Sequence, residues 1–158
     1  MRSRRAAAIL GCAVLTALSA AACTPDVTSQ RVTTTFGQTF TRLYRLQLTE
    51  LGRPSPTPLL RLGSGGRVIR QQAYAHARCH KGARHSVQTG AGDNWTCIEF
   101  FQRPGGAIAE ADYEVSVQTN GCLIATGPAQ VIGKPQLQTP AGKTVVNPLS
   151  QFDACFST

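Results

Sequence analysis

The sequence predicts one α+β domain, in which an N-terminal helix packs on an antiparallel sheet of about four to six strands held by two disulfides. Three observations support this fold class. Residues 32–51 repeat apolar side chains at the spacing of one helical face. Residues 113–119 alternate apolar and polar side chains strictly, as a half-buried strand does. The last four cysteines form an even set that can close two bridges.

Residues 1–22 have the composition of an export signal. Arginines at positions 2, 4 and 5 precede an apolar or small-residue stretch from Ala6 to Ala22. This arrangement predicts a secretory signal peptide, which we leave out of the fold. A retained membrane anchor is the alternative, but a spanning helix needs about 20 apolar residues.

The next residue, Cys23, follows three alanines, and Ala-Ala-Ala-Cys resembles the lipobox of bacterial lipoproteins, although Ala20 stands where Leu is usual. The resemblance implies a diacylglyceryl group on Cys23, attachment to the outer face of the cell membrane, and a lipidated tether over residues 23–31. Ordinary secretion after cleavage near Ala22 is the alternative. A second lipobox-like stretch ends at Cys12, but the apolar run before it is too short.

Four cysteines remain for bridges once Cys12 is discarded and Cys23 is lipidated. Three connectivities are possible, and export to an oxidising compartment would allow any of them to persist. We favour the pairing in which partners are close in sequence, Cys79–Cys97 and Cys122–Cys155.

Residues 32–158 form the predicted domain, and its first element is the helix. Val32, Phe36, Phe40, Tyr44 and Leu48 lie on one face, while Gly52 and then Pro54 provide a stop. Residues 53–67 are expected to be an extended connector, because prolines alternate in it and glycines follow. Residues 68–79 alternate again and predict a strand, although the alanines would also permit a helix.

Two central strands follow. Residues 95–102 are apolar on both alternations, which predicts a strand covered on both faces. The next strand places Tyr113, Val115 and Val117 on its buried side. Asn120-Gly121 favours a two-residue type I′ turn, and that register would bury Cys122 and Ile124 as well.

Short strands are predicted near the C-terminus at residues 131–132 and 144–146, around a turn at residues 140–143. Beyond them, the aromatic residues Phe152 and Phe156 and the bridge at Cys155 are expected to pin the end of the chain.

The chain carries a formal charge of +8, and its charges are segregated. Basic residues dominate between Glu50 and Asp93, whereas the acids Glu99, Glu110, Asp112 and Glu114 come later in the chain. The last three of these acids are expected to share the exposed face of a strand. On the predicted strand, one outward row forms a possible contact surface, consisting of Arg70, Tyr74, His76 and Arg78. Such a row could bind a protein or an anionic envelope polymer. A solvated face without a partner is the alternative, and we expect no nucleic acid to bind.

The histidines are the candidates for chemistry. His76 and His80 bracket Cys79, and His85 follows, so a small secreted hydrolase or nuclease using them as general acid and base is the enzyme alternative. The sequence has no HExxH motif or paired CxxC motif, and no Gly-x-Ser-x-Gly motif. We therefore predict no catalytic residue, metal site or cofactor.

Five stretches together resemble a family of small extracytoplasmic proteins, often lipoproteins, from high-GC Gram-positive bacteria. They are FTRLYRLQLTELGR, the segment around Cys79, GAGDNWTC, YEVSVQTNGC and NPLSQFDACF. The resemblance implies the four-cysteine framework and an envelope location, and it implies no activity. We expect a membrane-anchored, non-catalytic binding or envelope-interaction module, with a purely structural spacer as a further possibility.

Overall fold

A computed structural model describes residues 26–54, 60–62, 68–70, 75–83 and 88–157. Its secondary-structure elements, in chain order, are α1 (Ser29–Glu50), β1 (Leu60–Leu62), β2 (Val68–Arg70), β3 (Ala75–Lys81), β4 (Gly92–Gln102), β5 (Ile108–Val117), β6 (Cys122–Thr126), α2 (Ala129–Ile132), β7 (Gln136–Gln138), β8 (Thr144–Val146) and β9 (Gln151–Cys155). The predicted signal peptide, Cys23, Tyr74 and His85 lie outside the described residues.

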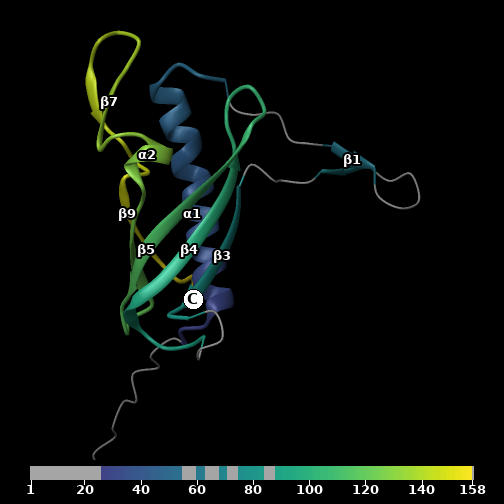
Figure 1. The fold of residues 1–158 in the computed structure, drawn as a ribbon, viewed down its shortest axis with the longest axis vertical. Helices are drawn as coiled ribbons and strands as arrows, with labels where there is room; N and C mark the ends of the chain where they lie inside the picture. The colour runs from purple at the N-terminus through teal and green to yellow at the C-terminus, as the bar shows by residue number, and fades with distance from the viewer. Residues whose placement is uncertain (1–25, 55–59, 63–67, 71–74, 84–87, 158) are drawn as a thin grey trace, which may run out of the picture.

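The domain has two layers. Five antiparallel strands form a sheet in the order β3-β4-β5-β6-β9, and β1–β2 and β7–β8 are separate two-stranded hairpins. The long helix α1 lies along one face of the large sheet (Figure 1). The predicted α+β architecture, with an N-terminal helix on an antiparallel sheet, is confirmed.

The predicted apolar stripe is the buried face of α1. Val32, Phe36 and Phe40 are fully buried, and Tyr44 and Leu48 are nearly so. The helix begins earlier than the stripe, because the hydroxyl of Thr28 caps it by accepting from the N–H of Arg31 at 3.3 Å. It ends as predicted at Gly52, whose φ of +61° suits glycine.

An aromatic cluster joins the two layers. The ring of Phe36 lies 5.1 Å from that of Tyr113 and 5.4 Å from that of Phe152, measured between centroids. The ring of Phe40 lies 5.3 Å from that of Phe101. Aromatic residues from one helix and three strands therefore form the centre of the core.

Both disulfides are the predicted pairs, and each connects directly opposed residues of neighbouring strands. Cys79 and Cys97 bridge β3 to β4 within the core, whereas Cys122 and Cys155 bridge β6 to β9 on the outer side of the sheet. Two bridges in a small domain indicate an oxidising environment outside the cytoplasm.

The turn between β5 and β6 is longer than predicted. The N–H of Gly121 donates to the carbonyl of Gln118 at 3.0 Å, and the N–H of Gln118 donates to the carbonyl of Cys122 at 2.8 Å. Gly121 has a φ of +81°, but Asn120 does not have positive φ, as a type I′ turn would need. The loop is therefore a type I turn followed by a glycine bulge.

The extra loop residue shifts the register of β6 by one. Val117 faces Leu123 and Val115 faces Ala125, so Leu123 and Ala125 are buried. The prediction that Cys122 and Ile124 would be buried was wrong, because a one-residue shift turns every side chain of a strand to the other face.

Three further expectations need correction. Residues 68–79 do not form one strand: β2 pairs with β1 in its own hairpin, and β3 pairs with β4. Within the expected connector, residues 60–62 form β1. Val131 and Ile132 belong to α2, and the predicted strand at residues 144–146 pairs with β7 instead.

The remaining correction concerns the faces of β4. Helix α1 covers the face that carries Trp95, Cys97 and Phe101. Ile98 and Phe100 lie on the opposite face and are only half-buried. Among the described residues β4 is thus covered on one face, not on both as predicted. No helix in the described part of the chain is long and apolar enough to cross a membrane.

Candidate binding groove

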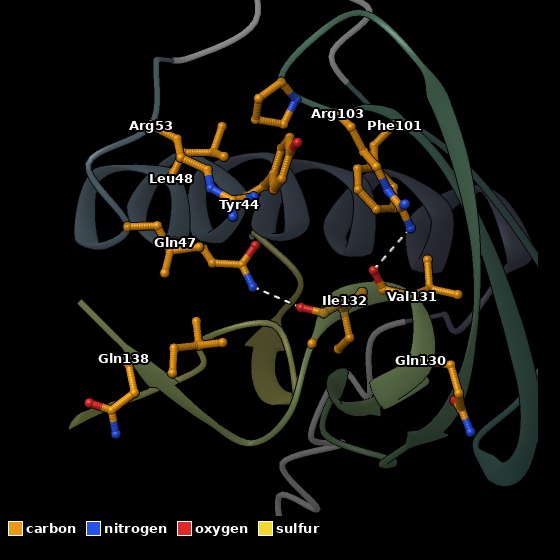
Figure 2. Close-up of a pocket in the computed structure, with 14 residues that line it drawn as sticks. Tyr44, Gln47, Leu48, Arg53, Phe101, Arg103, Gln130, Val131, Ile132 and Gln138 are labelled. Carbon is orange, nitrogen blue, oxygen red and sulfur yellow. Dashed lines mark hydrogen bonds between the residues drawn. The ribbon is translucent and has the colours of Figure 1, made fainter. Parts of the chain in front are cut away.

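A groove of about 470 Å³ lies at the end of the domain where α1 finishes. Its walls come from the last turns of α1, the turn after β4, and the segment from α2 to β7 (Figure 2). These segments are far apart in sequence and meet only in the folded chain.

Tyr44 lies near the middle of the groove. Its hydroxyl donates to the carbonyl of Gln102 at 2.8 Å, which fixes the ring against β4. Burial raises the pKa of the Tyr44 phenol, while Arg103 and Arg53 oppose the rise through their charge. The phenol is therefore neutral near pH 7 and acts as a fixed donor.

Two arginines reach the groove from different elements, with Tyr44 between them in Figure 2. Arg53 follows the helix stop, where its backbone N–H donates to the carbonyl of Leu48 at 2.8 Å. Arg103 begins the turn after β4, and its guanidinium donates to the carbonyl of Val131 at 3.3 Å. Both side chains are exposed to solvent.

A buried amide network holds the floor of the groove. The side-chain amide of Gln47 donates to the carbonyl of Ile132 at 2.9 Å and to the side-chain oxygen of Asn147 at 2.8 Å. The Asn147 amide in turn donates to the carbonyls of Ile132 and Lys134. Since both amides are buried and satisfied, α2 is held firmly against α1.

The side chains that line the groove are suited to binding an anion. Among the described residues that line it are two arginines, three glutamines and several apolar side chains, but no carboxylate, histidine, serine or cysteine. Guanidinium groups bind phosphate and carboxylate oxygens through paired hydrogen bonds.

The predicted contact row does not form as one surface. His76 and Arg78 lie on the outer face of β3 and are exposed. Arg70 belongs to β2 in a separate hairpin, and Tyr74 lies outside the described residues. The four residues are therefore not a single row on one strand, because the chain leaves one sheet and enters another between positions 70 and 75.

His76 and His80 lie on the same face of β3, four residues apart, which separates their backbones by about 13 Å. A shallow pocket on that face includes His80 but not His76. His85, the third histidine of the enzyme alternative, is outside the described residues. No group of three or more metal-ligating side chains occurs in the part of the chain that the structure describes.

Glu99 is a chemically unusual residue that was not singled out from the sequence. It is fully buried beneath α1, on the same face as Cys97 and Phe101, and neither carboxyl oxygen has a hydrogen-bond partner among the described residues. Burial raises the pKa of Glu99 to about 8, and the backbone N–H of His76 opposes this rise. The alternation from Trp95 to Phe101 already placed position 99 on the buried face.

The groove was not predicted. Only the helix stop at Gly52 and the turn at residues 103–106 were visible in the sequence, and nothing indicated that they would meet. The chain matches no family model, no curated protein and no solved structure.

Proposed function

We propose that the protein is an extracytoplasmic lipoprotein, attached to the cell membrane through Cys23, whose domain is a non-catalytic module that binds an anionic polymer of the envelope. The observation that carries the proposal is the groove that Arg53 and Arg103 line without any carboxylate. The alanine-rich segment before Cys23 and the two disulfides support the location.

The position of the groove favours a polymer over the lipids of the anchoring membrane. The tether would leave from the beginning of α1, and the groove lies at the helix's other end. A helix of 22 residues is about 33 Å long. On such a tether, the groove would lie beyond the lipid head groups and be open to the polymers of the envelope.

The groove also suits a ligand that combines anionic groups with hydroxyls. Arg53 and Arg103 would hold phosphate or carboxylate groups. The exposed amides of Gln130 and Gln138 can donate to hydroxyl oxygens and accept from hydroxyl hydrogens.

Lipidation is tested first by phase partitioning. In a bacterium that processes lipoproteins, the wild-type chain is expected in the detergent phase and the Cys23→Ser variant in the aqueous phase. Cys12→Ser serves as the matched control, because it alters the other lipobox-like cysteine and should leave partitioning unchanged. If Cys23→Ser partitions like the wild type, the proposed attachment at Cys23 is wrong.

Binding is tested with short poly(glycerol phosphate) as the probe, by isothermal titration calorimetry. Replacing Arg53 and Arg103 together with glutamine is expected to weaken binding by about a hundredfold, since hydrogen bonds to charged groups contribute roughly 1.5–3 kcal/mol each. Arg42→Gln is the control, because Arg42 is an exposed arginine on α1 that does not line the groove. Equal loss in the control would point to nonspecific charge attraction, and the absence of wild-type binding would refute the polymer.

A further inference from the structure

The outer face of the large sheet, which α1 does not cover, has an ordered distribution of charge. Three consecutive cross-strand rows run from β3 through β4 to β5. In each row the residue on β3 is basic, the residue on β4 is uncharged and the residue on β5 is acidic. The rows are His76–Phe100–Glu110, Arg78–Ile98–Asp112 and His80–Thr96–Glu114.

The centre of this face is apolar and hollow. Ile98 and Phe100 on β4 are half-buried, although no described residue packs over them. A hollow of about 340 Å³ lies above them, bordered by Arg78, His80 and Glu110. Arg78 and Asp112 are exposed on either side of this hollow.

We infer that this face binds the same face of a second copy of the chain, related by a two-fold axis parallel to β4. Rotation about that axis places β3 of one copy over β5 of the other. Each row then packs against the same row of the second copy, running in the opposite order. Arg78 therefore lies opposite Asp112 of the second copy, and the two Ile98 side chains lie opposite each other. Such a two-fold interface is self-complementary.

The charge pattern favours a two-fold axis parallel to the strands over one that runs across them. A two-fold axis running across the strands would place β3 over β3 and β5 over β5, which opposes like charges. The strands of two packed sheets cross at about −30°. Residues close to the point where the two copies of β4 cross are displaced least by this rotation. Because Arg78, Ile98 and Asp112 form the middle row, their contacts are affected least by that crossing.

The position of the first residues of α1 agrees with the same axis. The helix α1 starts at the end of the sheet where β3 finishes, since the N–H of Ser29 donates to the carbonyl of Gln88 at 3.0 Å and Thr28 bridges Thr89. A two-fold axis parallel to the strands would bring both helix starts to one end of the dimer. Two tethered copies could then share one membrane, whereas an axis across the strands would point them in opposite directions.

A second copy explains this face better than an anionic polymer does. Three carboxylates lie two strands away from the basic row and would repel a polyanion, whereas a second copy uses both rows. The sheet face and the groove are therefore assigned to different partners.

The test is a charge swap, measured by sedimentation equilibrium over a concentration series. Each variant is made in the mature chain carrying Cys23→Ser, so that lipid does not cause association. Arg78→Glu alone and Asp112→Arg alone are each expected to raise the dimer dissociation constant by about tenfold or more, because each sets like charges against one another twice in the symmetric interface. The double variant carrying both changes should recover the dimer to within about threefold.

Arg42→Glu is the control, because it reverses the charge of an exposed helix residue away from this face and should leave the dimer unchanged. All the altered residues are exposed, so melting curves should confirm that each variant is folded. A wild-type chain that is monomeric throughout the series overturns the inference. So does a dimer that survives either single change, or a double variant no better than the singles.

Discussion

Replacing Glu99 with glutamine is expected to stabilise the folded protein by roughly 3 kcal/mol at pH 7, and by up to roughly 5 kcal/mol above pH 8. The pKa of this carboxyl is about 8 in the folded chain and 4.5 in its ordinary state. Between these two pH values the unfolded chain has released the proton and the folded chain still holds it. Stability therefore falls as pH rises through this window, and it stops falling above the folded pKa.

Glutamine has the shape of a protonated glutamate and no proton to release. The difference in unfolding free energy between Glu99→Gln and wild type should be near zero at pH 4 and should grow steadily up to pH 8. Urea denaturation at several pH values measures it. Glu110→Gln is the matched control, because Glu110 pairs with the same strand but is exposed. Parallel pH profiles for Glu99→Gln and wild type would contradict a buried, neutral Glu99.

Replacing Cys122 and Cys155 together with serine is expected to lower the unfolding free energy by about 4 kcal/mol, on the chain-entropy estimate for a loop of this length. The bridge spans 33 residues and joins β9, an edge strand, to the sheet. Without the bridge, the unfolded chain gains conformational freedom. In the folded chain, β9 is then held by its hydrogen bonds to β6, by the burial of Phe152 and by the contact of Arg31 with the ring of Phe156.

Chemical denaturation measures the loss, and hydrogen exchange should show β9 opening before β4 and β5. Asp153→Asn is the control, since it changes an exposed residue of the same strand and leaves the bridge intact. A double-serine variant within about 0.5 kcal/mol of the control would show that this bridge is not an important stabilising link.

Local sequence patterns correctly predicted the elements in which apolar residues recur several times on the same face. The stripe of α1 and the alternation of Tyr113, Val115 and Val117 each contain several independent signs of the same buried side, and both are confirmed. Sequence proximity also predicted the disulfide pairs correctly, because each pair joins neighbouring antiparallel strands.

Predictions that depended on one or two residues were less secure. Asn120-Gly121 is compatible with both a two-residue and a three-residue loop. The three-residue loop of the structure turns Cys122 and Ile124 to the outer face of the sheet, whereas the two-residue loop would have buried them. Residues 131–132 are too few to distinguish a strand from a helical turn. Glu99 was not assigned to a face from the sequence, although Cys97 and Phe101, which flank it on its own alternation, both lie in the core.

The amino-acid sequence alone was enough to predict an oxidising environment, the class of fold and the buried faces of α1 and β5, since the last two depend on repeated, short-range patterns. The groove and the charged rows of the open sheet face depended on the folded chain. Arg53 and Arg103 are 50 positions apart, and Arg78 and Asp112 are 34 apart. Only long-range strand pairing and helix packing bring such residues to one surface, and no local pattern encodes those contacts.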